Sequence, residues 1–153
     1  MTVCNEESLA RQIYLTARDM RNFAEKLLKP FCLTMEQFHL LNKLADNSGI
    51  SQRQLGEAAD KSPANMTRIL DRIEAKGLAV RREDPGDRRS SLVFLTDKGA
   101  VLVEEVFGVF NSYSARVVSG IAAADQRLAR EVLVKMGDNL NKMAEKTAEN
   151  IKR

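Results

Sequence analysis

Apolar residues recur every third or fourth position along most of this 153-residue chain, the spacing of amphipathic helices. The pattern predicts a long first helix from about Glu7 to Lys29. Pro30 ends it, because the residue before a proline is driven away from helical geometry. The predicted buried stripe of this helix consists of Leu9, Ile13, Ala17, Met20, Ala24 and Leu27.

The same capping signal predicts the starts of two shorter helices. Thr34 and Ser51 are each followed three residues later by glutamine, which is the capping box that satisfies free backbone amides at a helix start. We expect one helix from Thr34 to the polar break at residues 46–49. A second helix should run from Ser51 to near Ala59.

A fourth helix is predicted to begin after Ser62, with Pro63 in its first turn and Gly77 just past its end. Its apolar positions fall on one face, so they should be buried; they are Met66, Ile69, Leu70 and Ile73. The opposite face is small, polar or basic and should be exposed; it carries Ala64, Arg68, Asp71, Arg72 and Ala75.

Residues 78–82 and 91–95 read as two short strands around a turn at residues 84–87. Thr96 then caps a long fifth helix, and a sixth begins at Asp125. The fifth helix has the apolar stripe Leu102, Val106, Phe110, Tyr113, Val117 and Ile121. The sixth has the stripe Leu128, Val132, Met136, Leu140, Met143 and Ile151.

These elements predict a mainly α protein with a small β-hairpin, in the layout of a winged helix-turn-helix. Residues 31–99 would form a DNA-binding domain. Residues 1–30 and 100–153 would form a helical dimerisation region, because the apolar stripes of the end helices exceed what so small a domain can cover. A second copy of the chain would supply the missing surface, and paired half-site reading needs such a homodimer.

Composition narrows the function. Aromatic residues make up 5% of the chain and tryptophan is absent, which favours an aliphatic core of packed helices. The net charge is +3, and the segment from Lys61 to Arg89, with eight basic and five acidic residues, accounts for all of it. A positive cluster in the candidate DNA-reading segment suits a polyanionic partner.

Other classes of protein find little support in the sequence. There is no glycine-rich phosphate loop and no Ser/His/Asp or Cys/His constellation, so we expect no enzyme and no cofactor. The single histidine, His39, lacks companions for a zinc site. The start of the chain does not resemble a signal peptide, and no stretch is long enough to span a bilayer, so we expect a cytoplasmic protein.

The segment Gly77–Gly99 closely resembles the wing of the MarR family of bacterial and archaeal regulators. That wing has the pattern Asp-x-Arg, then a strand ending Leu-Thr, then Gly, supplied here by Asp87, Arg89, Leu95, Thr96 and Gly99. Thr67-Arg68 and Asp71-Arg72 look like the family's recognition helix. The resemblance implies a homodimeric repressor on a pseudo-palindromic operator. It also implies release by a small phenolic or anionic ligand, by cysteine oxidation or, in a few members, by zinc.

Each protomer should place the fourth helix in a major groove and the wing in the adjacent minor groove. Arg68 can reach guanine, Arg72 and Arg88 suit phosphates, and Arg89 suits a narrow minor groove. We expect Asp71 to hold Arg68 or Arg72 in position and Asp87 to orient Arg89. The predicted DNA contacts are Ser62, Ala64, Asn65, Thr67, Arg68, Arg72, Asp87, Arg88 and Arg89.

Three alternatives stay open. By analogy with the family, Phe31, Phe38, His39 and Phe110 could line an effector cavity, although aromatics at helical spacing are more often plain core. Cys32, and Cys4 near the chain start, could sense oxidant, which requires an accessible thiol with a lowered pKa. Finally, a winged helix can serve as a protein-interaction module that no longer binds DNA.

Overall fold

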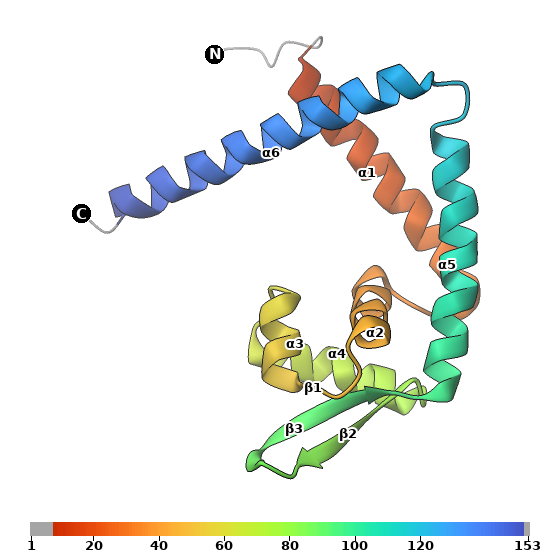
Figure 1. Ribbon diagram of the computed structural model, residues 1–153, viewed down its shortest axis with the longest axis vertical. Coiled ribbons are helices and arrows are strands. Elements are labelled where there is room, and N and C mark those ends of the chain that lie inside the picture. Colours follow the sequence, from red (N-terminus) through yellow and green to blue (C-terminus); the bar gives the residue numbers. More distant parts are fainter. Residues whose placement is uncertain (1–7, 152–153) are drawn as a thin grey trace. The chain divides into compact units, whose positions relative to one another are not determined.

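The computed structural model describes residues 8–151, excluding the side chains of residues 88–89 and 148–151. It contains seven helices in this range, one of them a short 3-10 turn, and three strands (Figure 1). The chain divides into two compact units, residues 1–111 and 112–153. The elements are α1 (Leu9–Leu28), η1 (Lys29–Phe31), α2 (Met35–Asp46), β1 (Ile50–Ser51), α3 (Gln52–Ala58), α4 (Pro63–Ala75), β2 (Ala79–Asp84), β3 (Asp87–Leu95), α5 (Asp97–Val117) and α6 (Ala123–Ile151).

The predicted capping boxes are confirmed. Thr34 accepts a hydrogen bond from the Gln37 amide at 3.2 Å, and the Gln37 side chain accepts one from the Thr34 amide at 3.2 Å. Ser51 and Gln54 make the same reciprocal pair at the start of α3. These local bonds fix where α2 and α3 begin, whatever packs against them later.

The end of the first helix differs from the prediction. The α-helical part stops at Leu28, and Pro30 sits in the 3-10 turn η1 rather than directly after the helix. Proline is tolerated there because its missing N–H has no partner in a first turn. Cys32 then takes the left-handed conformation, with φ of 54°, and turns the chain toward α2.

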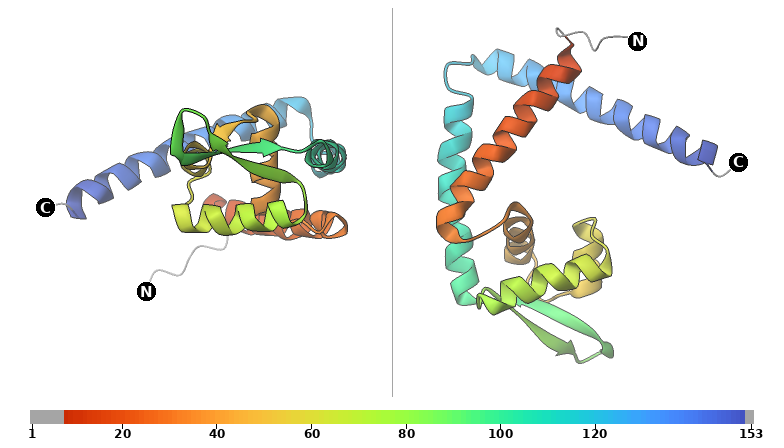
Figure 2. Two further views of the ribbon diagram at one scale, coloured as in Figure 1. Left: turned by 90° about the horizontal axis from the view of Figure 1, so that it is seen from below. Right: turned by 180° about the vertical axis from the view of Figure 1, so that it is seen from behind.

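The wing belongs to a three-stranded antiparallel sheet in the order β1-β3-β2, whereas the sequence predicted a hairpin alone. The short strand β1 pairs Ile50 with Val93. The strands β2 and β3 also run further than predicted, since their pairing continues to Asp84 and Asp87 around a turn of Pro85 and Gly86. The right-hand view of Figure 2 shows α4 lying beside this hairpin, whose turn projects away from it.

A single hydrophobic core holds the first unit together. It joins α2, α3 and α4 to the base of the sheet and to the first half of α5. Each fully buried aliphatic side chain contributes about 1.5–3 kcal/mol. The fully buried residues include Leu28, Leu41, Leu44, Leu55, Leu70, Ile73, Val93 and Val106.

The predicted stripes of the end helices are only partly buried within one chain. In α1, Ala24 is buried, whereas Leu9 and Met20 are exposed. The helix α5 ends at Val117, so Ile121 follows it outside the helix, after a turn at Gly120 with φ of 81°. The helix α6 begins at Ala123, two residues before the predicted start, and has no buried residue among those described.

Candidate nucleic-acid interface

The helix α4 presents the predicted two faces. Ser62 caps its start by accepting a hydrogen bond from the Asn65 amide, and Pro63 is its first residue. The four predicted core positions from Met66 to Ile73 are buried. The opposite face is exposed along its length and carries Ala64, Arg68, Asp71, Arg72 and Ala75.

Thr67 has a structural role within the fold. Its hydroxyl donates to the Pro63 carbonyl at 3.0 Å and accepts from the Gln52 side-chain amide at 2.9 Å. Gln52 opens α3, so these two bonds tie α3 to α4 and fix the angle between the two helices of the motif. Thr67 therefore shapes the candidate interface even though its hydroxyl is already engaged.

The wing turn is organised by Asp84, whose carboxylate accepts the Gly86 amide at 2.8 Å. Asp87 opens β3 and is exposed. Arg88 and Arg89 follow it in the strand, so the backbone places both close to the turn, while their side chains lie outside the described part of the structure. The predicted orientation of Arg89 by Asp87 thus remains a prediction.

Arg81 is a functional candidate that sequence reasoning missed. Its guanidinium, extending from β2, pairs with Asp71 and Glu74 of α4, each at 2.5 Å. This corrects the expected role of Asp71, whose observed ion-pair partner is Arg81 rather than Arg68 or Arg72. The alternation of Arg81 and Arg82 along a strand offered a weak signal, because one of two successive side chains must face the helix.

Lys61, the residue before the Ser62 cap of α4, is bound to α2. Lys61 forms an ion pair with Glu36 at 2.8 Å. The hydrogen bond and charge of Lys61 lower the pKa of the Glu36 carboxyl, and the charges of Arg68 and Arg72 add smaller contributions. Arg68 and Arg72 are therefore close enough to the start of α2 for their charges to act on Glu36. The helix dipole also favours an acidic side chain at this position.

The other end of α4 is held by the same turn of α2. The Lys76 ammonium donates to the side-chain oxygen of Gln37 at 2.9 Å and to the Cys32 carbonyl at 2.5 Å. Gln37 is a buried polar residue, and its side-chain oxygen accepts from both Lys76 and the Thr34 amide. The recognition helix is thus fastened at both ends to the segment that follows η1.

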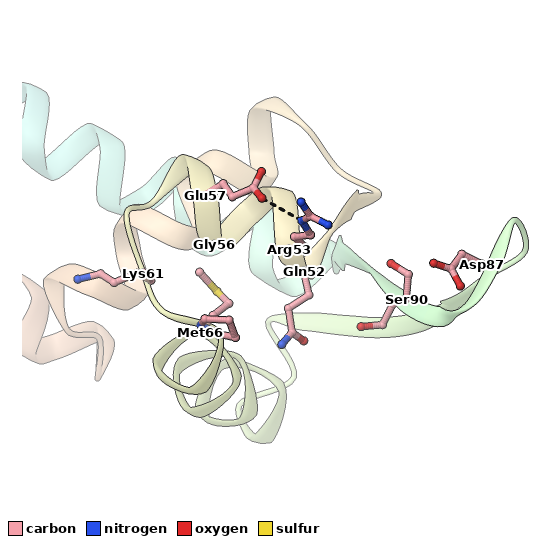
Figure 3. A pocket seen from close by; sticks show the side chains of 10 residues that line it. Gln52, Arg53, Gly56, Glu57, Lys61, Met66, Asp87 and Ser90 are labelled. Carbon is pink, nitrogen blue, oxygen red and sulfur yellow. Dashed lines mark hydrogen bonds and ion pairs between the residues drawn. The ribbon is translucent and has the colours of Figure 1, made fainter.

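Figure 3 shows a hollow between α3, the start of α4 and the wing, with a volume of about 670 Å³. Arg53 and Lys61 lie on its helical side, and Asp87 and Ser90 on its wing side. Arg53 pairs with Glu57 at 2.9 Å, but both side chains are mostly exposed. Such a surface pair is weak, so Arg53 can turn toward another anion.

The predicted effector residues Phe38 and His39 have different surroundings. Phe38 is buried and stacks on Phe110, with ring centroids 5.2 Å apart, and both belong to or pack against the core together with Phe31. His39 lines a different hollow of about 630 Å³ between α1 and α2, with Arg21, Glu25 and Lys61 among its other lining residues. His39 therefore lies at an accessible hollow, and a cavity shared by all four residues stays a prediction.

Cys32 is exposed and is a free cysteine, whereas Cys4 lies outside the described residues. Among the side chains that the structure describes, no three His, Cys, Asp or Glu groups are arranged to hold a metal ion. None of the helices within residues 8–151 combines the length and apolar character needed to cross a membrane.

Comparison with known proteins matches this geometry to one family. The MarR family model matches residues 33–91. Transcriptional regulator HosA of Escherichia coli O111:H- is 31% identical over 104 residues, covering 68% of this chain and 77% of that protein. The HTH-type transcriptional repressor Rv2887 of Mycobacterium tuberculosis is 27% identical over 139 residues, covering 91% of this chain and all of that protein.

A solved structure extends the likeness to the whole fold. The complex of Staphylococcus aureus MepR with DNA has a TM-score of 0.78 and 25% identity, covering 88% of this chain and 99% of that chain. The chain described here therefore belongs to the MarR family of transcriptional regulators.

Proposed function

We propose that this protein is a sequence-specific DNA-binding repressor that acts as a homodimer on a pseudo-palindromic operator. The observation that carries the proposal is the exposed face of α4, with Arg68 and Arg72 one turn apart beside a hairpin that carries Arg88 and Arg89. Helices of this kind fit the major groove, and arginines of a neighbouring wing fit the minor groove. The DNA-bound relative MepR supports the same docking.

Each predicted contact has a distinct task in this proposal. Arg68 reads guanine, and Arg72 and Arg88 neutralise phosphates. Arg89 enters the minor groove. Ala64 allows close approach of the helix to base edges, and Asn65 reads an edge beside it. The Ser62 hydroxyl, which only accepts within the cap, keeps its proton for a phosphate. Arg53 joins these residues as a phosphate contact from α3.

The proposed dimerisation region comprises residues 1–30 and 100–153, and the proposed reader comprises residues 31–99. The exposed apolar side chains on α1 and α6 support this division, because a second copy would remove them from water. Because its partner is chromosomal operator DNA, we place the action of the protein in the cytoplasm.

Release of the operator by a small anionic or phenolic ligand completes the proposal. The hollow at His39 also has Arg21 on its wall, which supplies a cationic group for a carboxylate, whereas Lys61 on the same wall is paired with Glu36. In an anisotropy assay, salicylate should release bound operator. In a separate thermal unfolding experiment, it should raise the melting temperature of the free protein. If salicylate changes neither quantity and peroxide releases the operator instead, Cys32 becomes the sensor.

The decisive experiment is selection of the purified protein on random duplex DNA, followed by anisotropy of the selected site across a salt series. We expect a palindromic motif bound by two chains. The Arg68→Ala variant should lose about 1–3 kcal/mol of binding free energy and relax specificity at one base pair. The Arg72→Ala variant should bind more weakly to all sequences and lower the salt slope by about one unit.

Arg127→Ala on α6 removes the same charge from an exposed position outside the proposed DNA contacts and off the apolar stripe of α6, and should leave both the dimer and operator affinity unchanged. Enrichment of no motif, or equal losses in Arg68→Ala and Arg127→Ala, would contradict the proposal. In that case the protein-interaction module becomes the better description.

A further inference from the structure

Two successive arginines on β2 have opposite surroundings. Arg81 faces α4, whereas the guanidinium of Arg82 lies over the ring of Phe94, 5.0 Å from its centroid. The alternation follows from the strand, where successive side chains point to opposite faces of the sheet. The two residues carry the same charge at neighbouring positions, yet only Arg81 reaches the recognition helix.

Arg81 connects the wing to α4 through both its backbone and its side chain. Its amide donates to Glu74 Oε1 at 2.6 Å, and its Nε donates to Glu74 Oε2 at 2.8 Å. Its Nη2 reaches Glu74 Oε2 and Asp71 Oδ1, both at 2.5 Å. A planar guanidinium that pairs with carboxylates on successive helical turns restricts both distance and orientation, which a flexible ammonium does not.

The partial burial of this cluster makes the contact stronger than an ordinary surface pair. The side chains of Arg81 and Glu74 are each 26% exposed. The hydrogen bond to Glu74 raises the pKa of Arg81, whose guanidinium is charged at any physiological pH in any case. We call the cluster of Arg81, Asp71 and Glu74 the bracket, and we expect it to hold β2 in one place on α4.

The ion pair of Arg81 with Asp71 also affects the charge of the exposed face of α4. It lies three residues after Arg68 on the exposed face of α4, and its own side chain is 55% exposed. A bare carboxylate at this position would repel DNA phosphates, because like charges at an interface oppose association. The Arg81 guanidinium supplies a compensating positive charge in direct contact with it.

We propose that Arg81 is a positioning residue for operator binding, which fixes the wing against the recognition helix and neutralises Asp71 on the DNA-facing surface. The inference rests on the proposed function, because positioning matters only if α4 and the wing bind one DNA duplex together. It assigns no base contact to Arg81 itself.

The test compares Arg81→Gln with Arg82→Gln, which removes the same charge one residue away and leaves the bracket intact. We expect Arg81→Gln to weaken operator binding about tenfold, which corresponds to about 1.4 kcal/mol, and Arg82→Gln to weaken it less. Adding Asp71→Asn to Arg81→Gln should restore part of the lost affinity, because the unpaired carboxylate is removed. Direct contact of Arg81 with phosphate predicts no such recovery.

A second measurement needs no DNA. The amide at position 81 is held by Glu74 in the folded protein, so its hydrogen exchange should accelerate in Arg81→Gln and stay slow in Arg82→Gln. Thermal melting establishes that each variant is folded, and Arg81→Lys serves if Arg81→Gln is not. Arg81→Lys should then show a weaker form of both effects.

Unchanged operator affinity in Arg81→Gln, absence of recovery with Asp71→Asn, or unchanged exchange at position 81 would each overturn the inference. These outcomes are distinct from failure of the proposed function, in which the wild-type protein itself selects no DNA sequence. That result would also remove the DNA-binding role assigned to Arg81, even if the exchange measurement confirmed the bracket.

Discussion

Gly99 illustrates how one missing side chain shapes the reader. A methyl group placed on Gly99 would lie 2.1 Å from the Leu78 carbonyl oxygen and 2.8 Å from the Leu95 side chain. The same carbonyl accepts a hydrogen bond from the Thr96 amide at 3.2 Å. The first turn of α5 thus meets the base of the wing backbone to backbone, and this close approach leaves no room for a side chain at position 99.

We expect Gly99→Ala to destabilise the protein by about 3 kcal/mol or more, since the clash is with backbone that cannot yield cheaply. Gly77→Ala is the matched control. Gly77 has φ of +69° and no neighbouring atom within 4 Å of an added methyl group, so only about 1 kcal/mol of backbone strain is expected. Urea unfolding at one protein concentration measures both losses. Equal losses of unfolding free energy in the two variants would show that the Leu78 backbone moves away from the added methyl group at little cost.

At the scale of elements, the start of α2 restrains both ends of α4. Lys61 reaches Glu36 before the recognition helix begins, and Lys76 reaches Gln37 and the Cys32 carbonyl where it ends. Gln37 also completes the capping box of α2, so one side chain serves two elements. The η1–α2 junction therefore contacts both ends of the recognition helix.

The pair of Lys61 and Glu36 predicts a pH dependence of stability. Lys61 lowers the pKa of Glu36 in the folded state, so its contribution is present above the unfolded pKa and is lost as the pH falls through the folded pKa. Lys61→Gln should cost less than about 1 kcal/mol at pH 7, because the Glu36 side chain is 52% exposed. The difference between wild type and variant should shrink in urea titrations below pH 4.

Lys43→Gln removes an equivalent charge from α2 and should not show this pH dependence, because Lys43 forms no ion pair with any residue that the structure describes. An Lys61→Gln difference that stays constant down to pH 3 would mean that Lys61 stabilises the fold through packing of its aliphatic stem instead.

At the scale of the whole molecule, the exposed apolar side chains of the end helices are the main feature left unpaired within one chain. Leu9 and Tyr14 on α1, and Leu128, Leu140 and Met143 on α6, are each more than half exposed. Scattered exposed apolar residues are ordinary, but Leu140 and Met143 are three residues apart, so they lie on one face of α6. A second copy of the chain is the partner that the proposed function requires.

Leu140→Glu should therefore shift the protein toward monomers in sedimentation velocity and weaken operator binding, because each half-site would then be bound separately. Asn141→Glu introduces the same charge change one residue away, off the apolar stripe, and should leave the dimer intact. If Leu140→Glu remains dimeric at micromolar concentration, α6 does not bury Leu140 in the interface.

The sequence by itself determined the features that arise from local chemistry. Capping residues placed the starts of α2, α3 and α4, and helical spacing identified the buried face from Met66 to Ile73 and the exposed face that carries Arg68 and Arg72. These signals act over one or two turns, so they need no knowledge of distant residues. The location of the positive charge could also be predicted from the sequence, because it requires only a count of the charged residues in each segment.

Only the tertiary structure decided which distant residues meet. The pairing of Ile50 with Val93, the bracket of Arg81 on Asp71 and the bonds of Lys76 to Gln37 join elements that no short-range pattern connects. Periodicity shows that a side chain is buried or that a strand alternates, but it does not name the partner. Those partners follow from how the elements pack, and they set the wing and the recognition helix in their relative positions.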